Sequence, residues 1–135
     1  TLTASTALCI SILRGTGSMI DEIINELKKI IPVVCYGSVT EKDMAGSTRW
    51  EFAVVTRSDL IKDGMRWYQI YAVSYVDEDY IQEGFELDII SAMKRIGLRP
   101  LENQRIEYAN ATVTKNETKV EAVTIQFKKE IKSGC

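Results

Sequence analysis

The residues that could do chemistry in this chain are mainly carboxylates, because its 135 residues include no histidine. Histidine is the usual general acid or base near neutral pH, so carboxylate, lysine, tyrosine or thiol groups would have to take that role. The densest carboxylate group lies between residues 77 and 88 and consists of Asp77, Glu78, Asp79, Glu83, Glu86 and Asp88. Such a group is typical either of a cation site or of the acidic start of a helix.

A calcium-binding loop is the cation site that this spacing resembles, with Asp77 in the first position and Asp88 in the twelfth. Such a loop needs glycine in the sixth position and an oxygen ligand in the fifth, where this chain has Gln82 and Ile81. We therefore interpret the acidic residues as a helix N-terminus, where the helix dipole favours negative charge.

Two further motifs are too incomplete to predict a site. Residues 15–18 (GTGS) precede a predicted helix, but they lack the Lys-Ser/Thr pair of a phosphate-binding loop and the full GxGxxG pattern. Cys9, Cys35 and Cys135 have no short spacing between any two of them, which argues against a zinc site or a redox pair. We predict no catalytic, metal-binding or cofactor-binding residue, and we do not expect an enzyme.

Charge and hydropathy also narrow the class of partners. The net charge is −2 and no basic run is present, so sequence-specific contact with nucleic acid is not expected. Residues 1–18 carry a single charge, Arg14, and their apolar part is too short to span a bilayer. They also lack the basic start and cleavage site of a secretory signal. We expect no membrane partner, and we interpret residues 1–18 as either a strand or an extension ahead of an original start at Met19.

The sequence predicts two amphipathic helices. Ser18 and Asp21 have the spacing of a capping box, and the helix that follows is stopped by Pro32. A second helix is predicted over residues 80–96, with Asp79 as its N-cap and Gly97 just beyond its C-terminus. The apolar stripes are Ile20, Ile23, Ile24, Leu27 and Ile31 in the first helix and Phe85, Ile89, Ala92, Met93 and Ile96 in the second.

Alternating side chains predict strands around these helices. The strands are expected at 33–39, 50–57 and 65–76, and in a hairpin over 105–131 that turns near 115–116, with polar connections at 40–48 and 58–64. The order is (β)-α-β-β-β-α-β-β. It predicts a single α+β domain over residues 19–131, with an antiparallel or mixed β-sheet and two helices packed on one face. Residues 132–135 are expected to form a short tail.

The strand at 65–76 is apolar on both faces, which is typical of a strand in the middle of a sheet with cover on each side. Since the helices can cover only one face, a partner subunit is expected on the other. Aromatic residues are enriched at protein interfaces, and a core position is the alternative for the two tryptophans. The candidate subunit-interface residues are Trp50, Trp67, Tyr71 and Tyr75.

From residue 19 to about 131 the chain resembles a family of small tail proteins of long-tailed bacteriophages and prophages, the tail terminator or tail completion proteins. The resemblance is carried by 48–50 (TRW), by 66–70 (RWYQI) leading through an acidic stretch to 81–93 (IQEGFELDIISAM), and by 120–127 (VEAVTIQF). The family often has proline where this chain has Gln82. Residues 1–18 have no counterpart, and none of the motifs is catalytic.

This resemblance implies a structural protein of the virion that assembles with copies of itself into a hexameric ring at the head-proximal end of the tail. The ring would stop polymerisation of the tail tube protein and join the tail to the head connector or neck protein. Assembly would take place in the host cytoplasm. Two alternatives stay open: another neck or head-tail joining component, and a small α+β ligand-binding domain or carboxylate-dependent enzyme.

Overall fold

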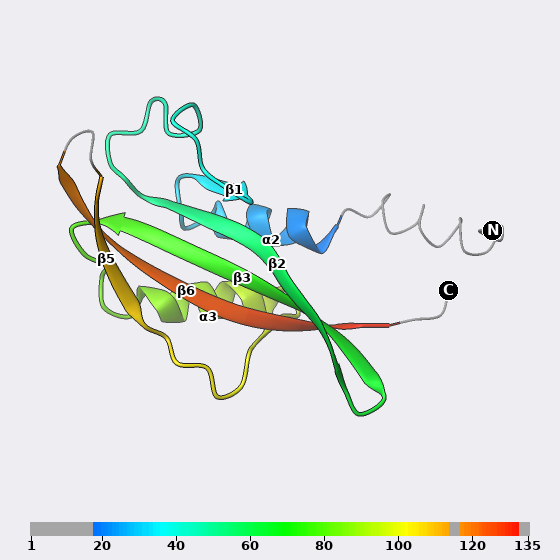
Figure 1. Cartoon of the computed structure of the whole chain (residues 1–135). Helices are drawn as coiled ribbons and strands as arrows, with labels where there is room; N and C mark the ends of the chain where they lie inside the picture. The colour runs from blue at the N-terminus through cyan, green and yellow to red at the C-terminus, as the bar shows by residue number, and fades with distance from the viewer. Residues whose placement is uncertain (1–17, 114–116, 133–135) are drawn as a thin grey trace.

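The computed structural model describes residues 18–113 and 117–132, which form a six-stranded mixed sheet with two helices on one face (Figure 1). The predicted α+β fold is confirmed. The strand considered within residues 1–18 and the turn near 115–116 lie outside the described residues. In chain order the elements are α2 (Met19–Leu27), β1 (Val34–Tyr36), β2 (Phe52–Asp63), β3 (Arg66–Glu78), α3 (Phe85–Arg95), β4 (Arg99–Pro100), β5 (Tyr108–Val113) and β6 (Thr118–Ile131).

The sheet is centred on β3, which pairs with β2 on one side and β6 on the other. These pairings are antiparallel, as are those of β4 and β5 with β6. Only β1 runs parallel to its neighbour, with Val34 opposite Ala53 of β2, which makes the sheet mixed. The aromatic strand is therefore central, as its two apolar faces predict.

The two helices differ from their predicted bounds at one end each. The Oγ of Ser18 accepts a hydrogen bond from the Asp21 amide at 3.2 Å, so α2 starts as predicted, but it ends at Leu27, before Pro32. The prediction that Asp79 caps the second helix is wrong, because α3 starts at Phe85 with Gly84 as N-cap. The segment before it is held against the sheet instead: Ile81 is buried, and its amide donates to a Glu121 carboxylate oxygen at 2.9 Å.

The hydrophobic core lies between the helices and one face of the sheet. Alternate residues of β2, β3 and β6 point toward α2 and α3, as period-two side-chain geometry requires. The residues of this core that are shielded almost completely include Ile23, Leu27, Ala53, Val55, Val73, Tyr75, Ile89, Ala92, Met93, Val123, Ile125 and Phe127. Both predicted helix stripes therefore contribute to one core.

The opposite face of the sheet has no helix on it (Figure 1). Its central residues follow the strand register: Phe52 lies opposite Val76, Val54 opposite Ser74, and Ser74 opposite Thr124. Each of these side chains is uncharged, and the hydroxyl oxygens of Ser74 and Thr124 lie 2.9 Å apart. We call this surface, formed by Phe52, Val54, Thr56, Ala72, Ser74, Val76, Ala122 and Thr124, the open face.

Strands β2 and β3 continue beyond the helices as a projecting hairpin (Figure 1). The predicted connection at 58–64 is wrong in this respect, since pairing continues to Asp63 opposite Arg66. Only Gly64 and Met65 form the turn, and Gly64 has a φ of 66°. Glycine adopts this backbone conformation without the steric cost that a β-carbon adds, which permits a two-residue hairpin turn. We call residues 60–67 the arm.

Candidate functional site

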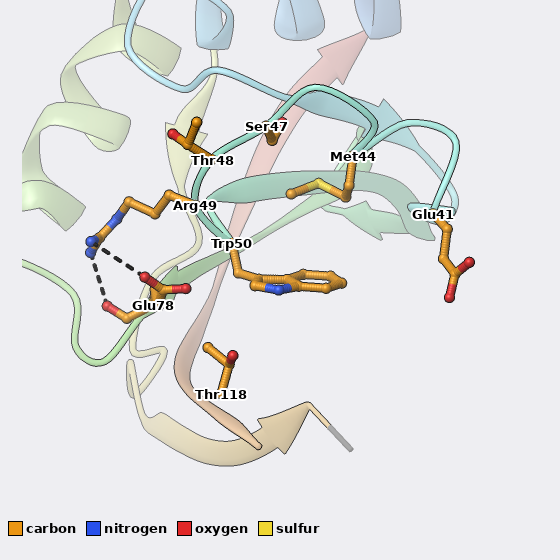
Figure 2. A pocket seen from close by; sticks show the side chains of 8 residues that line it. All are labelled: Glu41, Met44, Ser47, Thr48, Arg49, Trp50, Glu78 and Thr118. Atoms are coloured by element: carbon orange, nitrogen blue, oxygen red, sulfur yellow. Dashed lines mark hydrogen bonds and ion pairs between the residues drawn. The ribbon is translucent and has the colours of Figure 1, made fainter. Parts of the chain in front are cut away.

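A half-open cavity lies where β2 begins and β3 ends, at the end of this two-stranded ribbon opposite to the arm. Its volume is about 460 Å³. The loop before β2, the end of β3 and the start of β6 all contribute to its wall. The side chains that line it are Glu41, Met44, Ser47, Thr48, Arg49, Trp50, Glu78 and Thr118 (Figure 2). We call it the Trp50 cavity.

The loop over residues 40–49 is held in shape by its own hydrogen bonds. The Asp43 carboxylate accepts hydrogen bonds from both the amide and the hydroxyl of Thr40, each at 2.9 Å. These bonds stabilise the ionised form and lower the pKa of Asp43. The turn directs Met44 inward, where it is buried, and this side chain becomes part of the cavity wall.

A polar network ties this loop to the end of β3. Arg49 donates from Nε to Asp77 Oδ1 at 2.9 Å, and its Nη2 donates to the Glu78 carbonyl oxygen at 2.9 Å. The Asp77 carboxylate is buried, and it also accepts a hydrogen bond from the Glu78 amide at 2.8 Å. Charge-assisted bonds of this kind are stronger than neutral ones, so the network fixes the cavity wall rather than leaving Arg49 available to a ligand.

Tyr75 extends the same network into the core. Its hydroxyl lies 2.6 Å from Glu51 Oε2 and 3.0 Å from Asp77 Oδ2, and its single proton can be donated to either carboxylate. Burial raises the pKa of Tyr75, and the bond to Glu51 raises it further. The phenol is therefore held as a neutral donor between two acids, an arrangement that supports the fold and exposes no nucleophile.

The interior of the Trp50 cavity combines an aromatic face with acidic side chains. In Figure 2 the Trp50 indole lies between Met44 and Thr118, with Glu41 and Glu78 on either side. Arg49 is the only cationic side chain among the lining residues, and it pairs with Asp77 and Glu78. The cavity therefore presents one aromatic surface within a mainly polar wall.

The arm is the second region with a distinctive surface. Five of the nine large apolar side chains exposed in the described residues lie on it or directly beside it. Met65, at the turn, is 94% exposed, and Trp67 is 43% exposed with the Lys62 ammonium 5.8 Å from its ring. The five are Leu60, Ile61, Met65, Trp67 and Ile131, the last being the register partner of Trp67 on β6.

The four predicted interface residues fall into two groups. Trp50 lines the cavity and Trp67 lies on the arm, so both are accessible at the surface of the protomer. Tyr71 and Tyr75 belong to the helix-covered core, where they are 5% and 1% exposed. For these two the interface interpretation needs correcting, because the protomer's own helices already cover them. Tyr71, Tyr75 and Trp67 lie on the same face of β3, but the helices cover only the two tyrosines.

Sequence reasoning missed most of the arm. Gly64 was the available signal, since glycine in the first position of a two-residue loop between strands is typical of a tight hairpin turn. It would have converted the predicted connection into strand and drawn attention to Leu60, Ile61 and Met65.

The carboxylates between residues 77 and 88 do not converge on one point. Asp77 pairs with Arg49, whereas Glu86 lies on α3, buried, and accepts the Tyr108 hydroxyl at 2.5 Å. That bond raises the pKa of Tyr108 to about 12. Over 18–113 and 117–132, no three histidine, cysteine or acidic side chains are grouped as a metal site would require.

Comparison with known proteins gives no independent assignment: no protein-family model matches the chain, and no curated protein is significantly similar to it. Within the described residues, no helix has the length and apolar character to cross a membrane.

Proposed function

We propose that this protein is a structural component of a bacteriophage tail, which assembles into a hexameric ring at the head-proximal end of the tail tube. The ring ends polymerisation of the tube protein and joins the tail to the head connector or neck protein. The protein has no catalytic role in this proposal. The proposal rests on residues 19–131, the part of the chain that resembles tail terminator proteins.

The single observation that supports assembly best is the uncovered apolar surface. Met65 and Trp67 are exposed on the arm, and Leu60, Ile61 and Ile131 are exposed on it or directly beside it. Exposed apolar surface is costly in water, and in soluble proteins it is typical of a site where another chain binds. A chain of this composition has enough polar surface elsewhere to remain soluble as a subunit.

The charge distribution also suits a ring through which DNA passes. The chain has a net charge of −2 and 17 basic against 19 acidic residues, so it would not hold the DNA backbone tightly. A lumen that bound phosphates strongly would retard genome ejection. A joining protein therefore gains from a surface that is mildly repulsive to DNA.

The experiment is to mix the purified protein with its cognate tail tube protein and to measure tube lengths by negative-stain electron microscopy. We expect shorter tubes with a distinct cap at one end, and native mass spectrometry should give a closed oligomer. Tubes of unchanged length without caps would refute the terminator function. Binding to connector but not to tube ends would favour another neck or head-tail joining component.

A second candidate, a small ligand-binding domain, is favoured by one observation, the Trp50 cavity. Its volume of about 460 Å³ is comparable with that of small-molecule sites, which range from roughly 300 to 1,000 Å³. Trp50 fluorescence provides the test, because a ligand against the indole changes its emission. A monomer at high concentration whose Trp50 emission responds to a small molecule would favour this candidate over the ring.

A further inference from the structure

We propose that the Trp50 cavity binds an uncharged saccharide, which stacks one face of a sugar ring on the Trp50 indole and forms hydrogen bonds with the polar groups around it. This ligand class rests on the second candidate function, the small ligand-binding domain. It does not depend on assembly into a ring, so the site can be tested without tube or connector.

The Trp50 indole supplies a flat surface in a fixed orientation. It is half-buried, and its ring meets the Phe52 ring edge to face, with centroids 6.5 Å apart and planes at 67°. The face of an aromatic ring is electron-rich and attracts groups with a partial positive charge. A pyranose ring has C–H bonds of this kind on its faces, while its hydroxyl groups point outward around the edge. The indole is therefore suited to hold one sugar ring.

Three uncharged hydroxyl groups surround this surface. Ser47 and Thr48 belong to the loop before β2, and Thr118 is the first residue of β6 (Figure 2). None of the three side chains has a hydrogen-bond partner in the part of the chain that the structure describes. A hydroxyl group both donates and accepts, so each of them can pair with a sugar hydroxyl in either direction.

The Glu78 carboxylate adds an acceptor whose position is fixed from behind. Arg49 is held by hydrogen bonds to Asp77 and to the Glu78 carbonyl oxygen, and its Nη1 lies 3.9 Å from Glu78 Oε2. This pairing balances the charge of Glu78 and leaves lone pairs on its oxygens for other donors. A carboxylate can accept hydrogen bonds from two adjacent hydroxyl groups at once, and sugars present such pairs around the ring.

The charges of the cavity favour a ligand without charge. Arg49 is the one cation among the described lining residues, and it is already engaged, so a phosphate or carboxylate group would find no free positive partner there. Neither Glu41 nor Glu78 is free, because each has an interaction of its own. The described wall therefore offers no uncompensated carboxylate to attract a cation. What it does offer is one aromatic surface and several polar groups.

A nucleobase is the rival ligand, because every base also stacks on an aromatic side chain. The edges of bases are recognised most selectively by the amides of asparagine and glutamine or by a free guanidinium group. No amide side chain is found among the described residues that line the cavity, and the Arg49 guanidinium is occupied. Hydroxyl side chains do not distinguish donors from acceptors, which suits the similar hydroxyl groups of a sugar.

The first test is isothermal titration calorimetry of the full chain with a panel of neutral disaccharides that contain glucose, galactose, mannose or N-acetylglucosamine. We expect binding of at least one with a dissociation constant in the millimolar range or below. Trp50→Ala should weaken this binding by about tenfold or more, because it removes the stacking surface. Trp67→Ala is the matched control, since it removes the other tryptophan of the chain, on the arm, and should leave the affinity unchanged.

The second test removes one hydroxyl group and keeps the shape of the side chain. Thr118→Val should weaken saccharide binding by about two- to tenfold, the value of one hydrogen bond. Thr56→Val makes the same replacement on the open face and should leave binding unchanged. Circular dichroism checks that all variants are folded. Failure of every disaccharide to bind, or equal binding by folded Trp50→Ala and the parent, would overturn the saccharide site.

Adenosine and choline, titrated in the same way and by Trp50 emission in a Trp67→Phe chain, separate this assignment from the functions on which it touches. If either binds more tightly than every saccharide and Trp50→Ala abolishes its binding, the ligand-binding candidate stands and the saccharide assignment is wrong. If neither these two nor any saccharide changes Trp50 emission, both fail. Tube capping by Trp50→Ala that has lost saccharide binding would show that the site and the terminator function are independent.

Discussion

The two ends of the β2–β3 ribbon are built from similar residues and differ in what surrounds them. At one end, Tyr75 and Asp77 are enclosed by the helices and by Arg49, and no buried side-chain polar atom of the described residues lacks a partner. At the other end, Met65 and Trp67 extend beyond the helices and are exposed. The comparison shows that strand sequence specifies apolar surface, whereas the length of the covering helices decides whether this surface becomes core or stays exposed.

The sharpest way to test this difference is to truncate one aromatic side chain in the core and one on the arm. Phe127→Ala removes a fully buried ring and should lower the free energy of unfolding by about 3–5 kcal/mol, because it loses burial and leaves a cavity. Trp67→Ala on the arm should lower it by less than about 1 kcal/mol, because its ring is not part of the core cluster. Urea denaturation of both variants measures the gap. Equal losses would show that the arm is part of the folding core.

The core end of the ribbon was largely predictable from sequence. The stripes with Ile23 and Leu27 in one helix and Ile89 and Met93 in the other follow the helical period, and all four residues are buried as predicted. The cap at Ser18 was also predictable, since a side-chain oxygen at that spacing satisfies an amide that has no partner within the helix. The local sequence pattern was sufficient to predict these features because helix geometry alone determines where these side chains lie.

The Trp50 cavity and its network were not predictable in the same way. Arg49 and Asp77 are 28 residues apart, and only the pairing of β2 with β3 brings them together. The predicted start of α3 was wrong for a related reason, because the amide of Ile81 donates a hydrogen bond to Glu121, which is 40 residues away. Tertiary contacts such as these override local propensity, so sequence spacing carries no signal for them.

A smaller difference between the two ends is expected for their acidic residues. Asp77→Asn removes the charge that binds Arg49 in a buried position and should lower the free energy of unfolding by about 1–3 kcal/mol. Asp63→Asn, at the exposed end of the same ribbon, should change it by less than about 0.5 kcal/mol. Thermal or urea unfolding provides the measurement. A large loss in Asp63→Asn would mean that the arm turn depends on a carboxylate interaction.

Tyrosine ionisation provides a test of the hydrogen bond between Tyr108 and Glu86. The hydrogen bond from Tyr108 to Glu86 raises its pKa from 10.0 to about 12, because the bond favours the neutral phenol. The folded pKa is the higher one, so the stability from this bond is present below the unfolded pKa and is lost as pH rises through about 12. Phenolate absorbance should lose one tyrosine from its late-titrating component in Tyr108→Phe, whereas the buried Tyr75, whose pKa is also raised, still titrates late in that variant. An undiminished late component in Tyr108→Phe would show that Tyr108 does not contribute to it.

The smallest expected effect concerns the contact between the two helices that cover the core. Glu26 on α2 accepts a hydrogen bond from Arg95 of α3 and another from Lys29, both at 3.0 Å, and these bonds lower its pKa. A lowered carboxyl pKa means stability that is present above the unfolded pKa and lost as pH falls through the folded one. Glu26→Gln should therefore be slightly less stable than the parent at neutral pH and equal to it in acid, because ion pairs near the protein surface contribute little to stability. Glu83→Gln, on the exposed approach to α3, should match the parent at both pH values, so a pH-independent loss in Glu26→Gln would rule out the ion pairs as its cause.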